Sequence, residues 1–142
     1  MKVLLDTNVL LDIMMDSREN HIDSTSVLRV ADAGHLQAVI TTQSIIDAHY
    51  VLVSAAKTPL PDFKTSLNEI ISVAKVVPIS ESDIQEAIKS PNSDFEDAAQ
   101  IACAVSSGCD CIISSDVKMK RDSQVTVYTP KEFCNQIFGP WH

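Results

Sequence analysis

The stretch KVLLDTNVLLD, residues 2–12, determines how the rest of the chain is interpreted. Val3, Leu4 and Leu5 form an apolar run as long as a buried strand, and Asp6 follows without an intervening turn residue. A carboxylate at the point where a strand leaves the core costs free energy unless it has a partner. Further acidic residues occur at comparable places along the chain, so the sequence indicates that several acids act together.

Apolar runs of strand length alternate with longer segments of helical spacing. The pattern predicts strands over 2–5, 38–41, 76–79, 111–113 and 125–128, and helices over 8–15, 22–34, 43–56, 62–75, 81–89 and 95–107. Such alternation predicts an α/β fold with a mostly parallel sheet covered on both faces. Binding sites in these sheets form at the carboxyl ends of the strands, where Asp6 and Asp116 are both expected.

Composition limits the class of protein only loosely. The 142 residues suit one domain, 1–142, and no apolar run approaches the about 20 residues of a membrane span. Without a secretory signal, we expect a cytoplasmic protein with four reduced cysteines and no membrane association. The net charge of −8 argues against a nucleic-acid partner, but that argument weakens if several of the acids form a metal site.

The segment DFEDAAQIACAV, residues 94–105, places two acids beside an apolar helix face. At about 100° per residue, one arc contains Asp94, Asp97, Ala98, Ile101 and Val105, whereas Glu96 and Gln100 point the other way. Acids also favour the first turn of a helix because of its dipole, which explains Glu96 better than Asp97. A carboxylate that faces the core, as Asp97 is expected to do, needs a compensating partner.

A divalent cation is the partner that would let these acids converge. Asp6, Asp94, Asp97 and Asp116 are expected at one rim of the sheet, where their negative charges would repel one another without it. If repulsion dominates, Asp6→Asn should melt higher than wild type in EDTA. Oxygen ligands without histidine or thiolate select Mg²⁺ or Mn²⁺, which activate water for attack at phosphorus.

Asp47, in TTQSIIDAHYVL, is a further candidate that the sequence places less firmly. Its helix is apolar over most of its circumference, and Asp47 shares a polar stripe with Gln43, Tyr50 and Ser54. That stripe faces either the acidic cleft or water.

Nearly the whole chain resembles the PIN-domain nucleases. LLDTNVLLD is similar to their opening motif, DFEDAAQIACAV to their third acidic motif, and IISSDVKMK with VYTPKEF to their fourth acidic motif and closing helix. The resemblance implies a three-layer α/β/α sandwich, Mg²⁺ or Mn²⁺ as cofactor, and endonucleolytic cleavage of single-stranded RNA. It is strongest toward the ribonuclease toxins of bacterial toxin–antitoxin pairs, which implies a cognate antitoxin protein as partner and allows a homodimer.

The resemblance also assigns expected roles to individual residues. Asp6, Asp97 and Asp116 match the metal-binding acids, and Asp94 matches an acid present in part of the family. Asp47 stands where many members have Glu, so its shorter side chain would reach the metal through water. The polar residues that match supporting positions of the site are Asn8 and Ser114.

Basic and acidic residues outside these motifs leave alternatives open. Lys118, Lys120 and Arg121 follow Asp116 and would either hold RNA phosphates or belong to a solvated loop. Asp12 and Asp16 on the first helix are expected to be solvated.

Two other functions compete with the nuclease. A phosphatase of the haloacid-dehalogenase type would need a second Asp at position 8, where this chain has Asn8. A catalytically degenerate PIN domain that binds RNA or protein without cutting is the non-enzymatic alternative, and Asp47 in the Glu position favours it.

Overall fold

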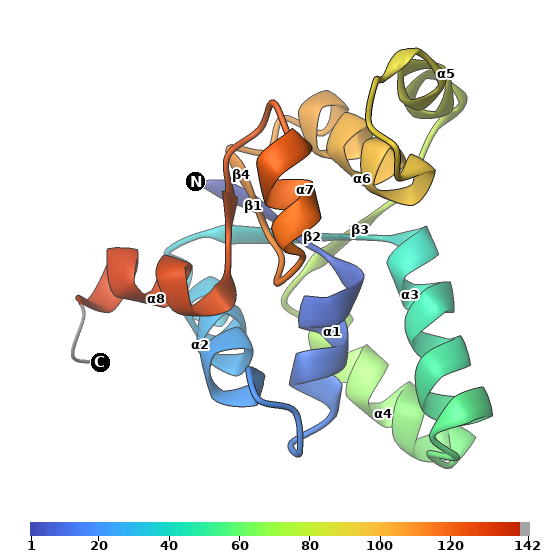
Figure 1. Cartoon of the computed structure of the whole chain (residues 1–142). Coiled ribbons are helices and arrows are strands. Elements are labelled where there is room, and N and C mark those ends of the chain that lie inside the picture. Colours follow the sequence, from blue (N-terminus) through green and yellow to red (C-terminus); the bar gives the residue numbers. More distant parts are fainter. Residues whose placement is uncertain (140–142) are drawn as a thin grey trace.

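The protein, described here from a computed structural model over residues 1–139, is built on a five-stranded parallel sheet (Figure 1). The strand order is β3-β2-β1-β4-β5, so β1 lies at the centre of the sheet. Leu4 of β1 pairs with Val39 of β2 and with Ile112 of β4. The strands are β1 (Lys2–Leu5), β2 (Gln37–Thr41), β3 (Lys75–Val77), β4 (Cys111–Ile113) and β5 (Val127–Tyr128).

Helices cover both faces of the sheet, as the alternating pattern predicted. Figure 1 shows α5 and α6 on one side and α1, α2, α4 and α8 on the other. The helices are α1 (Thr7–Met14), α2 (His21–Asp32), α3 (Thr42–His49), α4 (Leu60–Ile71), α5 (Glu81–Lys89), α6 (Phe95–Ser106), α7 (Val117–Asp122) and α8 (Pro130–Phe138). A π-helix, η1 (Tyr50–Ala55), continues α3. The three-layer α/β/α sandwich is therefore confirmed.

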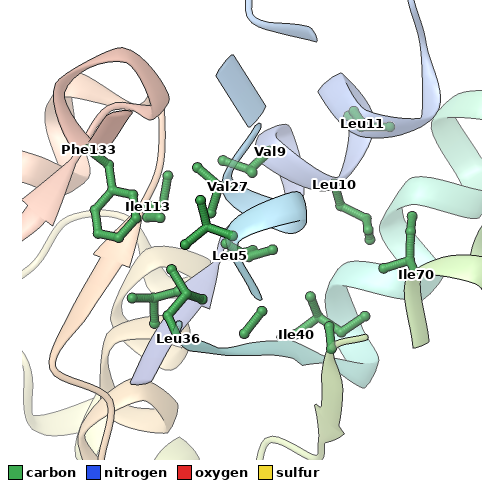
Figure 2. Packing of buried hydrophobic residues seen from close by; sticks show 14 of the residues in the cluster. Leu5, Val9, Leu10, Leu11, Val27, Leu36, Ile40, Ile70, Ile113 and Phe133 are labelled. Carbon is green, nitrogen blue, oxygen red and sulfur yellow. The ribbon is translucent and has the colours of Figure 1, made fainter. Parts of the chain in front are cut away.

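Alternate residues of the central strand serve two hydrophobic clusters, because successive strand side chains point to opposite faces. Val3 and Leu5 belong to the larger cluster, which lies between the sheet and α1, α2, α4 and α8 (Figure 2). Leu4 belongs to the smaller one, with Ile112 and Met119. Because β1 is buried on both faces, its carboxyl end and the residue that follows are held in a fixed place.

Two helices end at glycines with a left-handed backbone conformation. Gly34 follows α2 with φ +85°, and Gly108 follows α6 with φ +72°. Left-handed conformations of this kind end helices and favour glycine because it has no Cβ. Each helix thus ends shortly before the next strand in the chain, which is β2 after α2 and β4 after α6.

Three expectations from the sequence are changed by the structure. Residues 117–122, where no helix was predicted, form the short helix α7. The last strand is shorter than predicted, covering only Val127–Tyr128. Asp12, expected in solvent, is 2% exposed and binds Arg18 Nε at 2.8 Å and Ser24 Oγ at 2.9 Å. Packing of α1 on α2 buries this carboxylate and supplies the partners that it needs.

None of the helices formed by residues 1–139 has both the length and the apolar character needed to cross a membrane.

Candidate active site

A cleft of about 860 Å³ opens at the carboxyl edge of the sheet. Figure 1 shows the first turns of α1, α3 and α6 around this edge. The cleft is lined by all of the acids that the sequence singled out, namely Asp6, Asp47, Asp94, Asp97 and Asp116, together with Glu96. The fold therefore brings together side chains that lie up to 110 positions apart in the chain.

Three of these acids are helix N-caps. The side chain of Asp6 accepts a hydrogen bond from Thr7 N at 2.9 Å at the start of α1. Asp94 caps α6 and Asp116 caps α7 in the same way. Aspartate is favoured at such positions because its oxygens satisfy backbone N–H groups and its charge meets the positive end of the helix dipole. The helix termini thereby offset part of the repulsion among the carboxylates.

Asp6 is held by four donors. Its Oδ1 accepts from Thr7 N at 2.9 Å and from Gln100 Nε2 at 3.2 Å. Its Oδ2 accepts from Asn8 Nδ2 at 3.1 Å and from Ser114 Oγ at 2.7 Å. The two residues expected to support the site, Asn8 and Ser114, thus both contact Asp6. With 7% of its surface exposed, this carboxylate has one defined orientation.

Asp97 is the acid of the cleft whose hydrogen bonding is incomplete. It is 8% exposed, and its Oδ2 is buried without a hydrogen-bond partner among the described residues. Burial first, and then the neighbouring carboxylates of Asp116, Asp94 and Asp6 in that order, together raise the pKa of Asp97 from 3.8 to about 7. A buried oxygen that lacks a donor among negative neighbours would be satisfied by a cation.

The donor set fits a hard divalent ion. The acids that line the cleft offer only carboxylate oxygens, which Mg²⁺ and Mn²⁺ prefer. Within residues 1–139, no three acidic, histidine or cysteine side chains already stand close enough to form a ligand set. Mg²⁺ does not require one, because it keeps several waters and takes one or two carboxylates from the protein. Asp97, with its unpartnered oxygen, and its neighbour Asp116 are the residues best placed to supply them.

Asp47 lies in the lining of the cleft. Gln43 and Tyr50, which share its polar stripe, line the cleft with it, whereas Ser54 is exposed and does not. The Asp47 side chain is half-buried, and its Oδ1 accepts a hydrogen bond from Gln43 Nε2 at 2.9 Å. Three of the four residues of this stripe therefore line the cleft, and the part of Asp47 in the chemistry stays a prediction.

The predicted orientation of α6 was partly wrong. Gln100, expected to point away from Asp97, is 6% exposed and donates to Asp6, whereas Val105, expected in the core, is 49% exposed. The helix packs against the sheet and also against α5, through Ala98 and Ala99, so its buried surface is wider than one stripe. The spacing of Asp97, Gln100, Ile101 and Ala104 is the i, i+3, i+4, i+7 pattern that could have revealed the true face.

The basic residues after Asp116 lie outside the cleft, and none is among the described residues that line it. Lys120 Nζ contacts Glu132 of α8 at 2.5 Å, which lowers the pKa of that glutamate. Arg121 Nε lies 3.7 Å from Asp122, and Lys118 is exposed on α7.

The parallel α/β/α sandwich with a carboxylate-lined cleft places the chain among α/β domains whose site lies at the carboxyl ends of the strands. Within that class, the chain belongs to the PIN domain family, whose model matches residues 2–118.

Relatives of this chain include proteins described as ribonucleases and toxins. It is 29% identical over 141 residues to Ribonuclease VapC1 of Aquifex aeolicus (strain VF5), an alignment that covers 95% of this chain and 94% of the relative. A toxin–antitoxin complex from Klebsiella pneumoniae is similar in structure, with a TM-score of 0.65, 21% identity, and coverage of 90% of this chain and 97% of that one. Mycobacterium tuberculosis VapC20, described as a sarcin–ricin loop cleaving toxin, has a TM-score of 0.66 at 10% identity, covering 84% and 93%. These two structures share the fold of this chain.

Proposed function

We propose that this protein is a Mg²⁺- or Mn²⁺-dependent endoribonuclease that cleaves single-stranded RNA. The observation that carries the proposal is the buried, unpartnered Oδ2 of Asp97 in a cleft lined by four more aspartates. Membership of the PIN domain family and the relationship to Ribonuclease VapC1 support the reaction and the substrate.

Some residues of the site would bind the ion, and others would orient the side chains that bind it. Asp97 and Asp116 would hold the ion, with Asp6 and Asp94 as further ligands from the caps of α1 and α6. When bound, the ion supplies an activated water and neutralises charge at phosphorus. Asn8 and Ser114 keep Asp6 in one rotamer through hydrogen bonds of 3.1 and 2.7 Å.

Asp47 would act from the opposite wall of the cleft. The hydrogen bond from Gln43 fixes its carboxylate. Its side chain is one methylene shorter than the Glu that many family members carry here. We therefore assign Asp47 to orienting water rather than to direct coordination.

The test is cleavage of a single-stranded RNA with Mn²⁺ or Mg²⁺ and with EDTA. Asp97→Asn should remove most of the activity because a neutral amide binds a dication far less well than a carboxylate. Asp83→Asn is the matched control, since Asp83 is 2% exposed but lies outside the cleft, bonded to Ser106 at 2.7 Å. Undiminished cleavage by the Asp97 variant, purified free of contaminating nuclease, would refute the assignment.

A degenerate domain that binds RNA or protein without cutting is the second candidate. The absence of a ready ligand set among residues 1–139 and the shorter Asp47 favour it. Wild-type protein that binds single-stranded RNA in Mn²⁺ but never cleaves it would establish this alternative.

We further propose that the protein is a toxin that acts in the cytoplasm with a cognate antitoxin protein. The structural likeness to a toxin–antitoxin complex from Klebsiella pneumoniae supports a partner of this kind. Expression of the chain alone should arrest growth, and co-expression of a small adjoining reading frame should relieve the arrest. Size-exclusion chromatography of the purified chain would decide whether it forms a homodimer.

A further inference from the structure

Gln100 is a buried polar residue in the middle of α6, surrounded in the sequence by small and apolar residues. Its carboxamide is 6% exposed and makes three hydrogen bonds. Nε2 donates to Asp6 Oδ1 at 3.2 Å and to Ser44 Oγ at 3.0 Å, and Oε1 accepts from Thr41 Oγ1 at 2.9 Å. Asp6, Ser44 and Thr41 are themselves buried, so water cannot replace these bonds without entering the core.

The charge of Asp6 fixes which way the carboxamide points. In the reverse orientation, Oε1 of Gln100 would face the carboxylate of Asp6, and two acceptors would repel each other. Thr41 Oγ1 accepts a hydrogen bond from Ser44 N at 3.0 Å, and of the two acceptors of its own proton Gln100 Oε1, at 2.9 Å, is nearer than Ser44 Oγ, at 3.2 Å. The observed orientation is therefore the one that satisfies the amide, the hydroxyl and the carboxylate together.

Through these bonds, Gln100 joins the two walls of the cleft. Asp6 begins α1 on one side, and Ser44 lies in the first turn of α3 on the other. Thr7 Oγ1 also reaches Ser44 Oγ, at 2.8 Å. Since Asp47 stands on α3 three residues after Ser44, the same link sets how far Asp47 lies from Asp6.

We propose that Gln100 is a positioning residue that fixes the Asp6 carboxylate and the α3 wall for a divalent cation and its water. This inference rests on the proposed function. Gln100 does not bind the ion, because both polar atoms of its carboxamide are already engaged. It lowers the ordering cost of binding by removing alternative orientations of Asp6, as residues behind metal ligands commonly do.

Gln100→Met tests the proposal because it keeps the length of the side chain and removes its hydrogen bonds. We expect the dissociation constant for Mn²⁺, measured by electron paramagnetic resonance, to rise about 10- to 100-fold. We also expect kcat on single-stranded RNA to fall while KM for the RNA stays within about twofold, since no contact with the RNA is removed. If Gln100 only stabilised the fold, its substitution would not produce this combination of weaker Mn²⁺ binding, lower kcat and unchanged KM.

Ser24→Ala is the matched control. Ser24 is fully buried on α2 and donates to Asp12 at 2.9 Å, away from the cleft. It should lower the melting temperature and leave the Mn²⁺ affinity unchanged. If Gln100→Met does not fold, as judged by circular dichroism, Gln100→Asn retains the amide but cannot span the same distance, and it should weaken Mn²⁺ binding in the same direction.

Three results would overturn the inference. Gln100 variants that fold and bind Mn²⁺ as tightly as wild type would remove the positioning role while the proposed function stands. Equal weakening of Mn²⁺ binding by Ser24→Ala would show a general loss of stability. Wild-type protein that neither binds Mn²⁺ nor cleaves RNA would overturn the proposed function and this inference together.

Discussion

The ionisation of Asp97 should make the metal-free protein less stable as the pH rises. Its carboxyl has a pKa of about 7 in the fold against an ordinary value of 3.8, so the folded protein holds a proton that the unfolded chain releases. The contribution of this carboxyl to the free energy of unfolding is therefore complete below pH 3.8 and is lost as the pH rises to about 7. At 1.36 kcal/mol per pH unit, the limit of this loss is about 4 kcal/mol.

The actual loss of stability is smaller than this limit, because the cleft is open to water and salt, which screen the charge of the Asp97 carboxylate. We expect about 1–2 kcal/mol, which corresponds to about 3–8 °C in melting temperature for a chain of this size. Asp97→Asn removes the ionisable group, so in EDTA it should melt higher than wild type at pH 8, and by less than half of that margin at pH 5, where most of the loss has not yet occurred. Asp83→Asn should show a constant difference over this range, because the pKa of Asp83 lies below its usual value and the group stays ionised.

Thermal melts at four pH values between 5 and 8, with and without Mn²⁺, measure both effects. Mn²⁺ should stabilise the wild type by about 2.7 kcal/mol at a hundredfold excess over its dissociation constant, and this gain should shrink as the pH falls and Asp97 is protonated. The reasoning fails if the difference between Asp97→Asn and wild type in EDTA is the same at pH 5 and pH 8. It also fails if the variant keeps the full stabilisation by Mn²⁺.

Asp47 and the basic residues of α7 give two further predictions. Asp47→Ala should lower kcat, and Asp47→Glu should preserve or raise it. If Asp47→Ala cleaves RNA as fast as wild type at every Mg²⁺ concentration tested, Asp47 has no part in the reaction. Neutralising Lys118, Lys120 and Arg121 together should weaken RNA binding and flatten its salt dependence, because fewer counterions are released. An unchanged salt slope would assign these three residues to solvent.

The sheet and most helices were predictable because their signals are local. Each strand shows a short apolar run, and Gly34 and Gly108 mark the ends of α2 and α6. The helix α7 was not predicted, because six residues are too few to show a periodic face and only Met119 in it is buried. Its start depends on the cap provided by Asp116, a residue that the sequence marked for another reason.

The acids of the cleft were predictable, but the network behind them was not. Asp6 and Asp116 follow strands, and that position alone brings them to one edge of a parallel sheet. The burial of Asp12 depends on Arg18 and on Ser24 of the neighbouring helix, which a helical wheel does not show. Gln100 was misplaced for the same reason, since its partners come from the N-cap of α1, from β2 and from α3.

The network reverses the expected sign of one substitution. Charge repulsion alone predicted that Asp6→Asn would melt higher than wild type in EDTA. In the structure, an amide NH₂ at Oδ2 would face Asn8 Nδ2, and at Oδ1 it would face Thr7 N and Gln100 Nε2. Either orientation removes the acceptor of at least one partly buried N–H group and places two donors against each other, which costs about 1–3 kcal/mol. The relief of repulsion is smaller, because helix α1 already stabilises the charge at its N-terminus.

We therefore expect Asp6→Asn to melt lower than wild type in EDTA and to lose most of the stabilisation by Mn²⁺. Loss of the cap charge alone would lower the melting temperature but leave the full gain with Mn²⁺, so the pair of melts separates a ligand from a cap. If Asp6→Asn melts higher in EDTA, repulsion outweighs the four hydrogen bonds. The account of Asp6 as a carboxylate held by its donors would then be wrong.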